Sequence, residues 1–155
     1  MIFTTLEQET STFSYHFRQD GIHEFLFHAV TPVEVNQWID TTQHMKPFVI
    51  EHQLHVRALY HMAHVWPTPY AIRNATETIR QLPKTIPTST ALLLDDSNIL
   101  ITLVQMFLRQ MPVRAMQSRR IFFQEDSAIQ WLEERRLQLE AQGYWDLPRE
   151  EVQRR

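Results

Sequence analysis

The sequence predicts an α/β domain with a mainly parallel sheet, an N-terminal β-hairpin and single helices joining successive strands. Segments that alternate apolar and polar residues are interleaved with segments that repeat apolar residues at helical spacing. The chain has 155 residues and no cysteine, which is enough length for one domain to bury a core without a disulfide. Helices that link consecutive strands favour parallel pairing.

The first element we expect is a β-hairpin. Residues 13–18 alternate aromatic and polar side chains, and residues 23–29 do the same. Asp20-Gly21 lies between them, and this dipeptide is typical of a tight turn between antiparallel strands.

A helix should follow the hairpin. Thr31 can act as N-cap, Pro32 suits the first helical position, and Glu34 would complete a capping box. Helical spacing continues toward Met45. The β-forming residues after it predict a strand within 54–62, with one apolar face and one partly polar face.

The second half of the chain repeats the strand and helix alternation. Thr68 and Pro69 predict the start of a helix that ends at Pro83, and Ala91–Leu94 form a short apolar strand. Asp95 or Asp96 can cap the helix that follows. Its predicted buried stripe consists of Leu100, Leu103, Val104, Phe107, Leu108 and Met111.

The last predicted strand is "RRIFFQ", and the last helix runs from Glu125 to Gly143, where the glycine can end it. We therefore expect one domain over residues 1–145, followed by a loose tail over residues 146–155.

Composition excludes several classes of protein. The two glycines, Gly21 and Gly143, cannot build a dinucleotide fingerprint, a phosphate-binding loop or a nucleophile elbow, and the lack of cysteine removes thiolate chemistry. The net charge is −3 and the basic residues are scattered, so nucleic acid is not an expected partner. No segment reaches the length of a membrane-spanning helix, and no signal sequence opens the chain, so we expect a cytoplasmic protein without membrane insertion.

The predicted order of elements resembles that of the STAS domain, and the chain is similar to SpoIIAA-like anti-sigma-factor antagonists. The best local matches are "RRIFFQEDSAIQWLEE" and "RALYHMAHVWPTPYAI". The resemblance implies a STAS-like fold and a non-enzymatic regulatory module. Phosphorylatable members carry an Asp-Ser pair after the third strand. Here that place reads Trp66-Pro67-Thr68-Pro69, so we interpret Thr68 as a helix cap.

Ligands of open parallel sheets bind beyond the carboxyl ends of the strands. This rule predicts a crevice at which the chain binds a protein partner or a small apolar ligand. Trp66, in the loop before a helix, is the residue best placed to meet a partner. The predicted site residues are His61, His64, Trp66, Thr68, Asp95 and Asp96.

Two other functions stay open. All eight histidines precede Trp66, so a metal-binding protein or metal-dependent enzyme could use His61, His64, Asp95 or Asp96 as ligands. The more ordinary interpretation of the histidines is a wetter sheet face on which they are solvated or hydrogen-bonded. A homodimer formed through that face is the third possibility. The preferred interpretation needs no metal and no cofactor.

Overall fold

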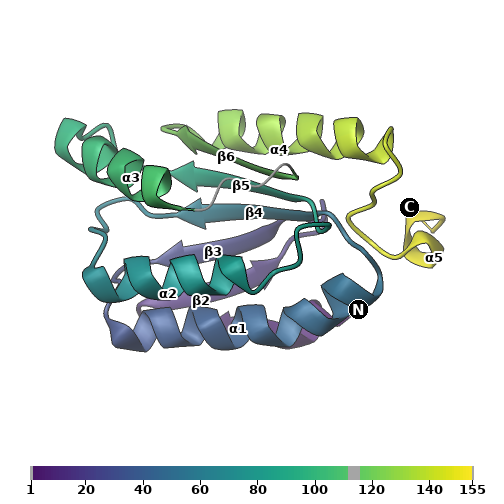
Figure 1. Ribbon diagram of the computed structural model, residues 1–155, viewed down its shortest axis with the longest axis horizontal. Helices are drawn as coiled ribbons and strands as arrows, with labels where there is room; N and C mark the ends of the chain where they lie inside the picture. The colour runs from purple at the N-terminus through teal and green to yellow at the C-terminus, as the bar shows by residue number, and fades with distance from the viewer. Residues whose placement is uncertain (1, 112–115, 155) are drawn as a thin grey trace.

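The computed structural model describes residues 2–111 and 116–154, which form a single sheet with helices on both of its faces (Figure 1). The strands are β1 (Gln8–Glu9), β2 (Phe13–Phe17), β3 (His23–Phe27), β4 (Val56–His61), β5 (Thr88–Leu93) and β6 (Gln117–Phe122). The helices are η1 (Thr4–Leu6), α1 (Pro32–Glu51), α2 (Pro69–Arg80), α3 (Asn98–Gln110), α4 (Glu125–Glu140) and α5 (Arg149–Val152).

The six strands lie side by side in chain order, from β1 to β6. Strands β1, β2 and β3 pair antiparallel, and β3 to β6 pair parallel. Gly21 turns the hairpin between β2 and β3 with a φ of 81°, a conformation that glycine adopts without strain. The predicted α/β class, the N-terminal hairpin and the helical crossovers are confirmed.

The helices divide between the two faces. Helices α1 and α2 lie together on one face and α4 lies on the other, while α3 lies beside the far end of the sheet (Figure 1). Among the described residues, none of the helices combines the length and the apolar character that crossing a membrane requires.

Helix α1 is longer than the sequence predicts, since it continues through Pro47 to Glu51. Pro47 is exposed, as is Gln43, whose carbonyl loses its helical hydrogen-bond partner because proline has no N–H. Met45 and Val49 lie one turn apart on the buried side. The apolar contacts of this last turn keep the segment helical up to the residues that precede the predicted strand.

The capping box predicted at the start of α1 forms only in part. Thr31 is the N-cap residue, and its carbonyl accepts the Val35 amide at 3.1 Å. Its hydroxyl, however, donates to the Glu34 carboxylate and accepts no backbone hydrogen bond.

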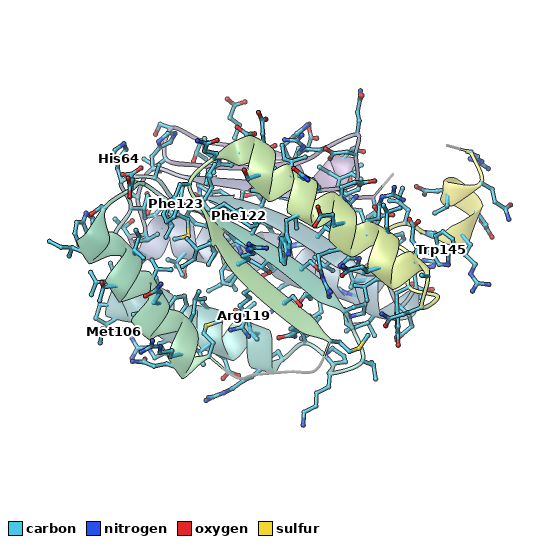
Figure 2. All side chains as sticks on the ribbon, turned by 90° about the horizontal axis from the view of Figure 1, so that it is seen from above. His64, Met106, Arg119, Phe122, Phe123 and Trp145 are labelled. Carbon is cyan, nitrogen blue, oxygen red and sulfur yellow. The ribbon has the colours of Figure 1, made fainter. Side chains whose placement is uncertain are left out.

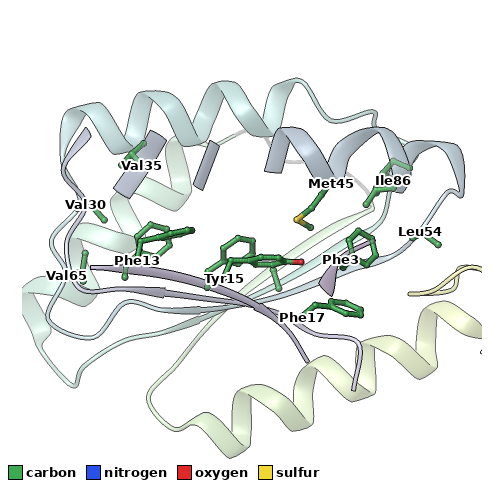
Figure 3. Close-up of a cluster of buried hydrophobic side chains, with 14 of the residues drawn as sticks. Phe3, Phe13, Tyr15, Phe17, Val30, Val35, Met45, Leu54, Val65 and Ile86 are labelled. Carbon is green, nitrogen blue, oxygen red and sulfur yellow. The ribbon is translucent and has the colours of Figure 1, made fainter. Parts of the chain in front are cut away.

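The main core fills the space between the hairpin strands and α1, where the side chains of alternate strand residues point to the helix (Figure 3). Phe3, which precedes η1, packs its ring 5.0 Å from that of Phe17 and 5.2 Å from that of Phe48. The N-terminal segment thereby closes one end of this core.

The face of β4 predicted to be partly polar is covered by α4, so the expectation of a wetter surface is wrong. On this face His55, Arg57, Ser89 and Asp146 form a buried polar layer, because each is at most 2 % exposed; His23 is equally buried on the face toward α1. Arg57 donates to the Asp146 carboxylate at 2.7 Å and to the carbonyl of Asp20. The histidines are hydrogen-bonded, as the same interpretation expected: His23 to Tyr15 and His55 to Ser89, each at 2.9 Å.

The packing of Asp146 and Leu147 differs from the expected loose tail. Both residues are buried, and the amide of His55 donates to the carbonyl of Trp145 at 2.8 Å. The short helix α5 follows them. The ion pair between Arg57 and Asp146 holds this segment against the sheet, and the composition of the segment alone does not predict that contact.

Replacing Asp146→Asn should lower the free energy of unfolding by about 3 kcal/mol, because it leaves the charge of Arg57 buried with weaker compensation. Urea denaturation followed by circular dichroism measures the change. Glu150→Gln removes an exposed carboxylate from α5 and is the matched control. Equal urea midpoints for the two variants would contradict the role given to Asp146.

The free energy of unfolding should also decrease as the pH is lowered below about 6.5. Burial, with the charge of Arg57, lowers the pKa of His23 and of His55 from 6.5 to about 3. The unfolded chain takes up protons at these imidazoles below about pH 6.5, whereas the folded protein does not, so the free energy of unfolding decreases as the pH falls from 6.5 toward 3. The slope is at most about 1.4 kcal/mol per pH unit for each histidine.

Urea denaturation at pH 7, 6 and 5 tests this dependence. His55→Gln should flatten the slope, and His44→Gln, at an exposed histidine of α1, should not. The assignment fails if wild type and His55→Gln lose stability equally across these pH values.

Candidate functional site

The predicted crevice at the carboxyl ends of the strands contains a close pair, His64 and Asp95. The imidazole Nδ1 of His64 lies 2.5 Å from the Asp95 carboxylate, which also accepts the His64 amide at 2.9 Å. His64 has a φ of 61°, an uncommon conformation for a side chain of its size. The pair ties the loop after β4 to the loop after β5.

Thr68 caps α2 as the sequence predicts. Its hydroxyl accepts the Ala71 amide at 3.1 Å and donates to the carbonyl of Val30 at 3.2 Å. Both roles of the hydroxyl are used locally. Trp66, two residues earlier, is 50 % exposed, and the side chain of Asp96 is exposed as well.

His61 faces the other side of the sheet, toward Glu24. Its Nε2 lies 2.9 Å from the Glu24 carboxylate, and this hydrogen bond is the main cause of a lowered pKa at Glu24. The ligand atoms of Glu24, His61 and Glu125 lie within 4.8 Å of one another. Arg18 lies 3.3 Å from Glu24 and 3.6 Å from Glu125.

The four predicted metal ligands therefore do not form one centre. His64 pairs with Asp95, whereas His61 pairs with Glu24, on the opposite face of β4. At the second group a divalent cation would have to approach the guanidinium of Arg18, which already lies within ion-pair distance of both carboxylates and would repel it. This arrangement favours an ion-pair network over a metal centre.

A mostly apolar hollow lies between the sheet and helices α1, α2 and α3. We call it the chamber, and its volume is about 250 Å³. Its helical walls are mostly apolar. They include Val35, Trp38, Met45 and Val49 from α1, Ala71, Ile72, Ala75 and Ile79 from α2, Val104, Phe107 and Leu108 from α3, and Met111, which follows α3.

Alternate residues of three neighbouring strands form the sheet side of the chamber. They lie in register as three rows, which are Val56–Thr88–Gln117, Ala58–Thr90–Arg119 and Tyr60–Leu92–Ile121. All of these residues except Ile121 line the chamber. We call Thr88, Thr90, Gln117 and Arg119 the polar floor. The chamber is thus polar where β5 and β6 begin and apolar where the strands end.

Two polar side chains of the apolar end satisfy each other. The indole N–H of Trp38 donates to the Tyr60 hydroxyl at 3.0 Å. Burial raises the pKa of Tyr60 to about 12, so the hydroxyl stays neutral. Trp38 also packs against the main core from α1.

The chamber lies outside the predicted set of site residues. The predicted strand Ala91–Leu94 omitted Thr88 and Thr90, although threonine is enriched in strands, and the predicted last strand omitted Gln117. The alternation of Thr88, Thr90 and Leu92 with Ser89 and Ala91 is the signal that could have revealed the longer strand.

Helix α3 is apolar on both sides. Val104 and Met111 are buried toward the chamber, whereas Ile99, Leu103 and Met106 are 66 %, 38 % and 52 % exposed. We call these last three residues the α3 stripe; Figure 2 shows Met106 on the outer side of the helix. The prediction that Leu103 is buried is wrong. The apolar face of the helix is wider than the surface that packs against the sheet.

No protein-family model and no curated protein matches the chain. Its fold is similar to the crystal structure of an anti-sigma factor antagonist from Mycobacterium paratuberculosis. The two share 10 % sequence identity, with a TM-score of 0.49, over 79 % of this chain and 93 % of the other. The likeness concerns the overall fold alone.

Proposed function

We propose that the protein is a non-enzymatic regulatory module that binds a small apolar ligand in the chamber. The observation that supports this function is the chamber itself, a hollow lined mostly by apolar side chains. A partner protein would bind at the rim formed by His64, Trp66 and Asp95, and its affinity would depend on whether the chamber holds a ligand.

The size of the chamber sets the size of the ligand. With a methylene counted at roughly 30 Å³, the volume of one water molecule, 250 Å³ holds about eight carbon atoms. Burying such a chain gains roughly 6 kcal/mol at about 0.8 kcal/mol per methylene. Association costs reduce this gain, so a purely apolar ligand binds weakly.

A neutral probe of about eight carbon atoms, 1-octanol, tests the proposal by titration calorimetry. Wild type should bind it, and Ala75→Phe should reduce the affinity about tenfold, because the new ring fills the space that the probe needs. Ala141→Phe adds the same ring at an exposed position at the end of α4 and serves as control.

Ile72→Ala provides the opposite change, since it enlarges the chamber and should keep or raise probe affinity. Circular dichroism verifies that each variant is folded. The function is wrong if wild type does not bind the probe, or if folded Ala75→Phe binds it as wild type does.

A protein partner is the second candidate, and the α3 stripe favours it. Ile99, Leu103 and Met106 repeat at helical spacing on the outer side of α3, a helix whose only charged residue is Arg109. Such a stripe fits the apolar face of a helix on another protein.

The test is a partner protein that wild type retains in a pull-down and that binds wild type again after purification. The double variant Ile99→Glu/Met106→Glu should abolish this binding. Gln105→Glu places the same charge on an exposed polar residue of α3 and should leave binding intact. Light scattering identifies a second copy as the occupant if wild type dimerises and the double variant does not. Equal binding by both variants excludes the stripe as the docking surface.

A further inference from the structure

We infer that the ligand of the chamber is an uncharged single-chain alcohol of about eight carbon atoms, whose hydroxyl is bound by Thr88, Thr90 and Gln117 and whose chain lies at the apolar end. This inference rests on the proposed function and specifies the ligand class of the same site. Three observations support it: the register of β5 and β6, the hydrogen bonds of the polar side chains around the chamber, and the apolar groups at its other end.

Three uncharged side chains of the polar floor are neighbours on one face of the sheet. Thr88 lies in register with Gln117, on strands about 4.8 Å apart. Thr90 lies on the same face as Thr88, because residues two apart on a strand point the same way. All three residues line the chamber and are half-buried. A small head group over this part of the sheet is therefore within reach of two hydroxyls and one amide.

The same three side chains have no hydrogen-bond partner within residues 2–111 and 116–154. The polar groups that α1 contributes to the chamber do have partners. The Thr42 hydroxyl donates to the carbonyl of Ile39 at 2.9 Å, and the Gln43 amide donates to Gln81 at 3.0 Å. Arg119, the charged member of the polar floor, likewise has an interaction of its own within the protein. The donors and acceptors left open on the floor are thus uncharged.

These open groups determine the chemistry of the head group. A threonine hydroxyl and a glutamine amide each donate and accept hydrogen bonds. An alcohol hydroxyl also does both, so it can pair with them without leaving a polar atom unsatisfied. A carboxylate donates no hydrogen bond and an ammonium accepts none, and either would lose hydration in a partly enclosed hollow.

Lys46 of α1 also lines the chamber, but it does not make the floor an anion site. Its side chain is half-buried, and a lysine stem usually covers apolar surface while its ammonium stays in water. A carboxylate on the floor would depend on this ammonium or on an arginine that is already engaged. The floor therefore favours an uncharged head group.

The opposite end of the chamber suits the hydrocarbon chain. It is formed by Phe27, Tyr60 and Leu92, and the Tyr60 hydroxyl is already paired with the indole N–H of Trp38 at 3.0 Å. Burial against these apolar groups stabilises a chain, whereas a hydroxyl placed there would lose water. The head of the ligand therefore lies toward the start of β5 and β6, and its chain toward the carboxyl ends of the strands.

Titration calorimetry with 1-octanol and 1-methoxyheptane tests the inference. The two molecules have the same number of carbon atoms, but the ether has no O–H to donate. Octanol should bind wild type about fivefold more tightly than the ether. Octanoate and octylamine at pH 7.5 should each bind more weakly than octanol, because the uncharged floor does not replace the hydration that a charged head group loses.

The double variant Thr88→Val/Thr90→Val should lower octanol affinity about fivefold and change the affinity for 1-methoxyheptane less, because valine keeps the shape of threonine without its hydroxyl. Gln117→Leu should have the same effect. It lies on a different strand, so a folding defect in one variant leaves the other as a test. Thr85→Val is the matched control, since Thr85 is exposed and precedes β5. Circular dichroism verifies that each variant is folded.

The outcomes separate this inference from the proposed function. If octanol and 1-methoxyheptane bind equally and Ala75→Phe weakens both, the chamber binds apolar ligands and the alcohol inference is wrong. The inference is also wrong if octanoate or octylamine binds more tightly than octanol. If folded Thr88→Val/Thr90→Val and folded Gln117→Leu both bind octanol as wild type does, the floor is not the site of the hydroxyl. If none of these ligands binds wild type, the proposed function is wrong as well.

Discussion

The structure depends on how one strand compensates a buried charge. Arg57 lies near the start of β4 with no exposed surface, and its guanidinium contacts the Asp146 carboxylate and the carbonyl of Asp20. A buried ion of this kind destabilises the fold unless its partners are held in place. The hairpin turn, the middle of the sheet and the segment after α4 are therefore joined at one guanidinium, and the position of the C-terminal segment follows from it.

Strand β4 also separates two different interiors. Its residues Arg57 and Leu59 point to α4, where polar groups and apolar side chains fill the space, whereas Val56, Ala58 and Tyr60 point to the chamber. The side beneath α4 is specified by hydrogen bonds that few substitutions would preserve. The chamber side is specified only by the size of its side chains. A domain organised in this way can keep a rigid frame on one face while its other face accommodates a guest.

The order of elements could be predicted from local patterns, because alternation, helical spacing and the Thr-Pro starts are properties of neighbouring residues. Thr68 behaves as its sequence indicates for that reason. The burial of Arg57 could not be predicted, because it depends on Asp146, a residue 89 positions away. His61 and His64 likewise appear equivalent in the sequence, yet strand pleating and a left-handed turn send them to different partners. The chamber arises from the way three helices pack on the sheet, so the sequence of any one segment does not predict it.

The chamber has a mechanical consequence. A hollow of about 250 Å³ that side chains leave open makes the folded state larger than close packing requires. Unfolding eliminates such a void, so the volume of the system decreases, and hydrostatic pressure shifts the equilibrium toward the unfolded chain. A ligand that occupies the hollow removes this volume difference. The occupied protein should therefore be less compressible and more resistant to pressure than the empty protein.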